Sequence, residues 1–326
     1  MGRKYRIIFL ISGIIFILFL SYSSVVSGQG KRDEYYYSPI SGLPLKNKPS
    51  TRPVAAVIEN SPAARPQKAL DRATVVYEIL AEGGITRFLA FFWEDIPEDM
   101  GPIRSMRSYF LDIIFPFHPL ILHCGASPDG FSRLQELDVE NLDQLSNSSY
   151  YYRDNDRETP HNLFTTERII DYLYSLSSEG YESIFSFNEV SIINSDARKA
   201  QKIVINYWND YRVIYQYKNK KNIYRRYLNS LDNPHHVERE KFIDVNNIIV
   251  QYVSTEIKDE QGRMDVKLRG EGEALIFDNG RVREGQWEKE DLESPIKYYN
   301  EQGQEVSLNP GKTWVQIVPE NSEVEW

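Results

Sequence analysis

The first half of the chain alternates short apolar runs with segments of helical spacing. The runs of strand length are 53–59, 74–80, 86–93 and 119–124. The segments whose apolar residues have helical spacing are 101–115, 129–137 and 166–176. Runs of the first kind indicate strands, and the i, i+3, i+4 spacing of the second kind indicates helices. Strands mixed with helices predict an α/β or α+β domain built on a mixed sheet.

From about residue 200 onward the pattern changes. Short β-rich runs follow one another, separated by turn sequences such as Asp278-Asn279-Gly280. An Asn-Gly pair between two such runs indicates a two-residue hairpin, because both of its positions require positive φ. The second half is therefore predicted to be a mainly antiparallel β domain. We place the two domains at 39–190 and 191–326.

The N-terminus has a third pattern. Arg3, Lys4 and Arg6 precede an uncharged, apolar stretch from Ile7 to Val26. A helix needs about 20 such residues to cross the hydrocarbon of a bilayer, and cationic residues in front of it stay on the cytoplasmic side. Residues 1–27 are predicted to be a signal peptide or an uncleaved transmembrane anchor, followed by a linker at 28–38. The protein is then expected at the cell membrane with its bulk outside, or secreted if the leader is cleaved.

Composition and charge narrow the classes of function. The 326 residues carry a formal net charge of −9, and nucleic-acid binding is not expected without a clustered basic face. The one basic run, at 218–226, alternates with tyrosines such as Tyr215 and Tyr224, which suggests exposed strand faces and a solvated hairpin tip. The single cysteine, Cys124, excludes an internal disulfide.

Two arginines are the first candidates for ligand binding. Arg104 and Arg107 lie three residues apart after a Gly-Pro pair, and are expected on one face of the predicted helix. Their planar guanidinium groups suit a carboxylate or a phosphate, and the start of a helix favours anions. The alternative is that they form ion pairs with the carboxylates of Glu78, Glu82 or Asp112.

The loop "RETPHNLFTT" at 157–166 supplies the second group of candidates. His161 and Asn162 follow a proline, and Arg153 and Asp154 come shortly before. If this loop folds back over Arg104, these residues form one polar cleft that can bind a small polar or anionic group or an extended polymer. The alternative is that Asn162 and Asp154 staple the loop through hydrogen bonds to its backbone.

Other polar residues have both a functional and a structural interpretation. Glu78, Glu82 and Arg87 flank a Gly-Gly turn, which either lets a ligand approach closely or only reverses the chain. His123 joins His161 as a candidate, but no spacing matches a known metal motif, so no metal or cofactor is predicted. The doublet of His235 and its neighbour at 236 is expected on the surface.

No nucleophile and base complete a catalytic pattern. The segment "GASPDG" at 125–130 resembles a nucleophile elbow. However, Asp129 stands where the last glycine belongs, and Pro128 lacks the N–H that an oxyanion hole needs. Cys124 ends an apolar strand, a position more typical of core residues than of reactive thiols.

Several of these motifs together resemble the YerB-like lipoprotein family of Gram-positive bacteria, whose two halves are catalogued as paired domains of unknown function. The resemblance covers nearly all of the chain after the leader. Its residues are 52–54, 59–60, 64–67, 76–88, 101–105, 123, 127–128, 153–154, 160–162, 278–280, 285–287 and 309–314. It implies a two-part architecture and an envelope location, and no established reaction. The chain departs from the family in having no cysteine after the leader to carry a lipid, and in having Cys124 after His123.

These observations favour an extracytoplasmic, membrane-tethered protein with a binding role and no catalysis. The expected partner is an envelope protein or a cell-wall component. The alternative is a hydrolase or transferase acting on an envelope polymer, with His161 as general base and Arg104 or Arg107 holding the developing negative charge. A structural spacer is a third hypothesis. Convergence of His161, Arg104 and a carboxylate in one open site would favour the enzyme.

Overall fold

The computed structural model describes residues 36–177, 183–189, 197–207 and 211–326. Residues 37–326 form one compact unit. The predicted leader and all but the end of the predicted linker lie outside the described residues. Within the described ranges, no helix is both long enough and apolar enough to cross a membrane.

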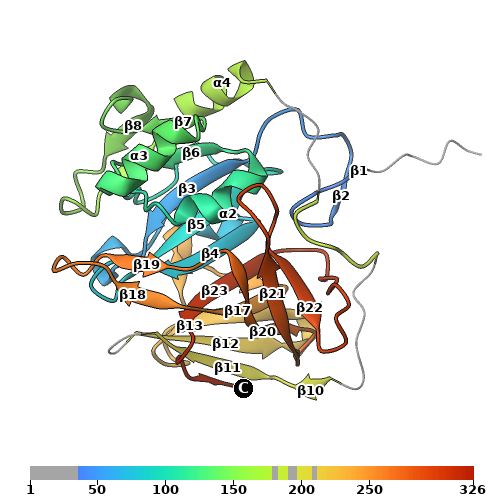
Figure 1. Ribbon diagram of the computed structural model, residues 1–326. Helices are drawn as coiled ribbons and strands as arrows, with labels where there is room; N and C mark the ends of the chain where they lie inside the picture. The colour runs from blue at the N-terminus through green and yellow to red at the C-terminus, as the bar shows by residue number, and fades with distance from the viewer. Residues whose placement is uncertain (1–35, 178–182, 190–196, 208–210) are drawn as a thin grey trace, which may run out of the picture. The chain divides into compact units, whose positions relative to one another are not determined.

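The first half of the described chain combines strands with short helices (Figure 1). Its strands are β1 (Tyr36–Tyr37), β2 (Pro44–Leu45), β3 (Val54–Glu59), β4 (Val75–Leu80), β5 (Thr86–Phe92), β6 (Leu120–His123), β7 (Asn141–Asp143), β8 (Tyr151–Arg153) and β9 (Leu163–Thr165). Its helices are α2 (Phe110–Ile114), α3 (Pro128–Glu136) and α4 (Arg168–Ser175), with 3-10 turns η1 (Pro62–Ala64), η2 (Leu70–Arg72), η3 (Phe115–Phe117) and η4 (Ser148–Tyr150).

The second half consists of strands joined by turns. Its strands are β10 (Arg198–Lys199), β11 (Lys202–Asn206), β12 (Arg212–Lys218), β13 (Ile223–Leu228), β14 (His236–Val237), β15 (Lys241–Phe242), β16 (Asp244–Val245), β17 (Asn247–Val253), β18 (Thr255–Ile257), β19 (Met264–Val266), β20 (Gly270–Asp278), β21 (Arg281–Lys289), β22 (Lys297–Asn300), β23 (Thr313–Pro319) and β24 (Val324–Glu325). Two 3-10 turns interrupt them, η5 (Asn219–Lys221) and η6 (Glu238–Glu240).

One large sheet contains strands from both halves of the chain. Its order is β10-β21-β20-β17-β23-β4-β5-β3-β6-β7, with β22 paired to β21. The halves join at the parallel pair of β23 and β4, where Thr313 aligns with Val75 and Gln316 aligns with Glu78. A second, five-stranded sheet has the order β16-β13-β12-β11-β24 and is antiparallel throughout.

This architecture confirms the predicted fold class. The first half supplies a mixed set of strands with few helices, and the second half is mainly antiparallel β. Strands β3, β4 and β5 are buried at every position, because both faces of the sheet are covered. Strands covered on both faces appear in a sequence as continuous apolar runs, which is why the first-half strands were predictable.

Two apolar cores lie on opposite faces of the large sheet. Neighbouring residues of a strand point to opposite faces, so Val76 belongs to one core and Tyr77 to the other. The first core includes residues of the five-stranded sheet, such as Tyr215. The second includes every apolar residue of α2. The large sheet is therefore a middle layer between the five-stranded sheet and that helix.

The predicted helix over 101–115 is wrong in its first part, since α2 begins only at Phe110. Residues 101–107 are extended because neighbouring segments take their backbone groups. The N–H of Arg104, for example, donates to Val57 O at 2.9 Å. Arg104 and Arg107 therefore do not share a helix face, and no helix start reinforces their charge.

The strand faces of the basic run are buried, contrary to the expectation of exposed faces. Tyr215 and Tyr224 pack in the first core, and Arg226 is fully buried. The reason is that β12 and β13 belong to the sheet that covers this core. The hairpin tip at η5 is solvated, as expected. The Asp-Asn-Gly hairpin is confirmed between β20 and β21, with φ of 51° at Asn279 and 70° at Gly280.

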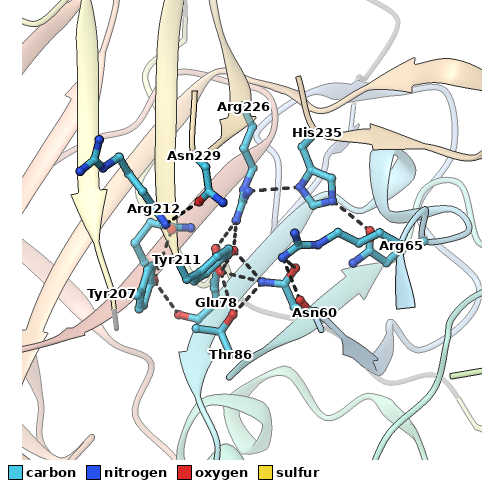
Figure 2. A network of polar contacts seen from close by, with 12 residues as sticks. Asn60, Arg65, Glu78, Thr86, Tyr207, Tyr211, Arg212, Arg226, Asn229 and His235 are labelled. Atoms are coloured by element: carbon cyan, nitrogen blue, oxygen red, sulfur yellow. Dashed lines mark hydrogen bonds and ion pairs between the residues drawn. The ribbon is translucent and has the colours of Figure 1, made fainter. Parts of the chain in front are cut away.

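A buried ion pair between Arg226 of β13 and Glu78 of β4 links the two halves (Figure 2). Both side chains are 0 % exposed, and Arg226 Nη2 lies 2.6 Å from Glu78 Oε2. Glu78 Oε1 accepts hydrogen bonds from Asn60, Thr86 and Tyr211, which offset part of the cost of removing both charges from water. Burial alone would lower the pKa of Arg226, but the Glu78 carboxylate, together with Tyr211 and Tyr215, outweighs burial and raises that pKa above its ordinary value.

His235 extends this network toward the first half (Figure 2). A guanidinium only donates, so His235 Nδ1 accepts from Arg226 Nη1 at 3.1 Å. The hydrogen on Nε2 then bonds to Gln67 Oε1 at 2.9 Å. Burial and the charge of Arg226 lower the pKa of His235 well below its ordinary value, so the ring is neutral. The expectation that His235 lies on the surface is therefore wrong.

We predict that Arg226→Met lowers the free energy of unfolding by about 3–5 kcal/mol, because it leaves the Glu78 carboxylate buried without a cation. Its neighbour Arg225 supplies a matched control. Arg225 pairs with Asp244 at a partly exposed position, and Arg225→Met is expected to cost only about 1 kcal/mol. Denaturant unfolding of the two variants measures the difference. Equal losses in both would contradict a special role for the buried pair.

Candidate functional site

Polar residues gather at the edge of the large sheet where β3, β4 and β6 end. β3 and β6 are parallel neighbours, and β5 runs antiparallel to both β3 and β4, so the carboxyl ends of β3, β4 and β6 share one edge. Glu59 is the last residue of β3, and Glu82 follows β4. Ligands of open sheets with parallel strands bind outside these carboxyl ends. The edge is therefore the part of the fold best placed to meet a ligand.

The centre of this edge is the Glu59 cluster, which consists of Glu59, Ser61, Arg104 and His161. Glu59 Oε1 accepts from Ser61 Oγ at 2.8 Å and lies 2.9 Å from His161 Nδ1. Because an ionised carboxylate only accepts, Nδ1 carries a hydrogen. The opposite ring nitrogen, Nε2, has no hydrogen-bond partner among the described residues. The His161 side chain is 23 % exposed, so this nitrogen belongs to the accessible side of the cluster.

Arg104 lies next to the second carboxylate oxygen of Glu59, Oε2. Its Nε lies 3.5 Å from Glu59 Oε2, close enough for an ion pair and too far for a good hydrogen bond. Both of these atoms are buried and have no hydrogen-bond partner in the described part of the chain. Glu59 is only 4 % exposed, whereas the Arg104 side chain is 27 % exposed. The cluster thus combines the buried carboxylate of Glu59 with two partly exposed nitrogen groups, the guanidinium of Arg104 and the imidazole of His161.

Two further arginines are bound to one carboxylate beside the cluster. Glu82 accepts from Arg87 Nη2 through one oxygen and from Arg107 Nη2, at 2.6 Å, through the other. Burial would raise the pKa of Glu82, but Arg87, Arg107 and Arg104 outweigh it and hold the pKa below its ordinary value. Burial, followed by the like charge of Arg107, lowers the pKa of Arg87 to about 10. The predicted alternative, ion pairing with Glu82, is what the structure shows for Arg107.

The predicted loop staple is present. The Asn162 side chain donates to the backbone oxygens of Asp154 and Arg157, at 3.1 and 3.3 Å, and accepts from Arg153 Nη1 at 2.8 Å. Arg153 and Asp154 therefore help to shape the loop that carries His161. The staple and the cluster coexist: Asn162 fixes the loop, and His161, the preceding residue, reaches Glu59.

Two predicted site residues lie elsewhere. Glu78 belongs to the buried pair with Arg226. His123 is fully buried, with Nδ1 2.9 Å from Gly125 O and Nε2 3.1 Å from Asn141 Oδ1. Both side chains are enclosed by protein groups, so neither reaches a ligand at this edge. Among the described residues, no group of three His, Cys, Asp or Glu side chains is arranged to hold a metal ion.

The nucleophile candidates have structural roles. Ser127 of the elbow-like segment is the N-cap of α3, and its Oγ accepts from Gly130 N. The Cys124 thiol donates to Gln144, and burial raises its pKa above the ordinary value. Ser61 approaches the same ring nitrogen as Glu59, Nδ1 of His161, at 3.3 Å. A serine activated by histidine needs the opposite nitrogen, so these contacts form no relay.

Comparison with known families gives matches to both halves of the chain. The model described as "Protein of unknown function (DUF3048) N-terminal domain" matches residues 40–181, and the corresponding C-terminal domain model matches 203–315. The chain belongs to the DUF3048 family. The resemblance to YerB-like proteins is thereby confirmed, and the family is shared with a relative from Bacillus subtilis.

That relative, named "Putative lipoprotein YerB", is 34 % identical over 295 residues, which are 87 % of this chain and 86 % of the relative. The crystal structure of YerB protein from Bacillus subtilis superposes with a TM-score of 0.79 at 30 % identity. The match covers 89 % of this chain and all of the other. The two chains therefore share the fold over most of this chain.

Sequence reasoning missed the two residues on which the cluster depends. Glu59 appeared only within a motif, and Ser61 was not singled out. One signal was available: Glu59, Asn60 and Ser61 form a polar triplet directly after the apolar residues 54–58 of β3. Such a position places side chains at the carboxyl edge of a sheet. Their meeting with His161, about a hundred residues later, depends on tertiary contacts.

We predict that Glu82→Gln destabilises the protein by about 1–3 kcal/mol at pH 7, because Arg87 and Arg107 lose their shared carboxylate. The folded-state pKa of Glu82 lies below its unfolded value of about 4.3. The contribution of Glu82 to the free energy of unfolding is therefore complete above its unfolded pKa and is lost as the pH falls through its folded pKa. The stability gap between wild type and variant should shrink as the pH falls from 7 toward 3.

Thermal or denaturant unfolding across this pH range measures the gap. Glu256→Gln, at an exposed position of β18, is the matched control and should leave stability nearly unchanged. A gap that stays constant with pH would show that the Glu82 charge is not what stabilises this edge.

We predict that Asn162→Ala loosens the loop that carries His161, because the buried side chain makes three hydrogen bonds within it. Leaving their partners unsatisfied should cost about 1–3 kcal/mol. Amide hydrogen exchange should accelerate at 153–162 and stay unchanged in the second half. Asn219→Ala, at an exposed turn, is the control. Unchanged exchange in the loop would contradict the staple.

Proposed function

We propose that this chain is an extracytoplasmic envelope protein, tethered to the membrane by its N-terminal segment, that binds an envelope protein or a cell-wall component without catalysis. The location is supported by the cationic, apolar leader pattern of the sequence and by the name of the Bacillus subtilis relative, "Putative lipoprotein YerB". The binding role is supported by the Glu59 cluster.

The observation that carries the binding role is the convergence of Arg104 and His161 on the buried carboxylate of Glu59. Each is partly exposed and each retains nitrogen atoms without a hydrogen-bond partner among the described residues. A fixed set of charged groups with unused hydrogen-bonding capacity is suited to holding a polar ligand. No described serine or cysteine stands where His161 can activate it, which favours binding over covalent catalysis.

One observation favours the enzymatic alternative as a second candidate. Glu59 fixes His161 through Nδ1 and leaves Nε2 open, as an oriented general base requires. Arg104 beside it suits a developing negative charge. In that case a water molecule or a hydroxyl group of the substrate would be the nucleophile, and the reaction would be hydrolysis or transfer on an envelope polymer.

In-cell photo-crosslinking of the full chain tests the binding role. The side chain of Leu145 is 67 % exposed. It lies beside Gly125, since a Cβ added to that glycine would be 3.3 Å from Leu145 Cδ1. The residue before Gly125, Cys124, bonds to the backbone of Arg104. A benzophenone side chain at position 145 is expected to capture an envelope component, and one at the exposed hairpin residue Lys220 is not. Adding the substitution His161→Gln to the protein with benzophenone at position 145 should reduce the yield of the crosslinked product severalfold.

Equal capture at both positions, or capture that ignores the His161 substitution, would contradict a binding role for the cluster. The same preparations separate the two candidates. If the wild-type full chain releases products from cell-wall fragments and His161→Gln does not, the enzymatic alternative is correct. Binding without release supports the proposal.

A further inference from the structure

Arg87, Arg104 and Arg107 differ in how many of their guanidinium nitrogens form hydrogen bonds within the protein. Arg87 donates from Nη1 to Ser105 O and from Nη2 to Glu82. Arg107 donates from Nε and Nη2 to Glu82 and from Nη1 to Met106 O. Every nitrogen of the Arg107 guanidinium is therefore occupied, and both terminal nitrogens of Arg87 are. These two groups serve the protein itself.

Arg104 is different. Its ion-pair contact is through Nε, on the side of Glu59, and its two terminal nitrogens have no hydrogen-bond partner among the described residues. With 27 % of the side chain exposed, the pair of terminal nitrogens remains available to a ligand. Such a planar fork matches the two oxygens of a carboxylate or of a phosphate group.

The buried carboxylate explains why Arg104 is held in this state. Glu59 Oε2 is buried and has no hydrogen-bond partner in the described ranges, a costly condition for an ionised group. Its attraction for the guanidinium fixes Arg104 by charge and leaves the terminal nitrogens unused. Ser61 and His161 hold the other oxygen, so the carboxylate cannot turn away.

The net charge of the side chains at this edge limits the charge of a matching ligand. Arg87, Arg104 and Arg107 bring three positive charges, and Glu59 and Glu82 bring two negative charges, so one positive charge is left when the imidazole is neutral. One negative charge neutralises it. A carboxylate and a phosphodiester each carry one, whereas a phosphomonoester carries about −1.5 to −2 near pH 7.

The imidazole adds a second requirement. When His161 is neutral, its hydrogen lies on Nδ1 toward Glu59, and Nε2 is an acceptor. It can receive a hydrogen bond from a hydroxyl or N–H group. Since Arg104 and His161 flank the same carboxylate, the matching ligand carries such a donor close to its anionic group.

We propose that Arg104 is the receptor for a singly charged oxyanion of the envelope ligand, a carboxylate or a phosphodiester, next to a hydroxyl or N–H donor that bonds His161 Nε2. This inference rests on the proposed binding function and assigns its chemistry. Glu59 is the positioning residue for both contacts, and Arg87, Glu82 and Arg107 are the support of the site.

Small matched probes test this assignment on the full-length protein in detergent at low salt. The carboxylate pair is the methyl glycoside of galacturonic acid and the methyl glycoside of galactose, which differ only in the carboxylate. The phosphate pair is glycerophosphoglycerol, a diester, and glycerol 3-phosphate, a monoester. Ligand-observed NMR titration gives the dissociation constants.

We expect at least one singly charged probe to bind measurably and the neutral galactoside not to bind. Arg104→Gln should weaken that binding about 10- to 100-fold, the range for hydrogen bonds to charged groups. Arg104→Lys, which keeps the charge and loses the fork, should fall between. Arg212→Gln, on the exposed side of β12, should have no effect. The comparison of the two singly charged probes decides between carboxylate and phosphodiester.

Equal binding of the neutral galactoside, tighter binding of the monoester than of both singly charged probes, or unchanged affinity in folded Arg104→Gln and Arg104→Lys would each overturn the inference. The crosslinking experiment at position 145 separates this from the proposed function. Capture that depends on His161 together with no binding of either singly charged probe would refute the ligand chemistry alone. Loss of capture would refute the binding role itself.

Discussion

The ion pair between Arg226 and Glu78 joins β13 of the five-stranded sheet to β4 of the large sheet, in which the two halves of the chain also pair through β23 and β4. A charge placed in a core is tolerated only where a partner and several hydrogen bonds accompany it, so a packing of β13 on β4 that separated Arg226 from Glu78 would be strongly unfavourable. Tyr211, Asn60 and Thr86 complete the shell around the carboxylate. Apolar burial is non-directional, and this pair adds a directional polar contact between the two sheets.

The same network supports the candidate site. Arg226 bonds to His235, His235 to Gln67, and the Gln67 amide to the backbone oxygen of Glu59 at 3.0 Å. Asn60, the next residue, bonds to Glu78. Glu59 is therefore held from the buried side by residues of both halves. A site on the end of a buried strand with this support is rigid, which favours binding through a preformed arrangement of charges.

The longer strands and the fold class were predictable, because burial on both faces of a strand leaves a continuous apolar run such as that of β3. The helix assigned to 101–115 was wrong because apolar spacing cannot reveal that neighbouring strands take the backbone groups of Arg104. The tyrosines of β12 and β13 were misplaced for a related reason: an alternating pattern indicates one covered face and does not say which residues face the cover.

By itself the sequence determined the longer strands, the change from a mixed to an antiparallel half, and the polar residues available to a site, since these follow from local apolar runs and turn chemistry. Only the tertiary structure decided which polar residues meet. It enclosed His123 and Glu78, bound Arg107 to Glu82, and brought His161 and Arg104 to Glu59. The physical reason is that a charge selects its partner by distance in space, and residues separated by long stretches of chain come within reach only after the sheets have packed.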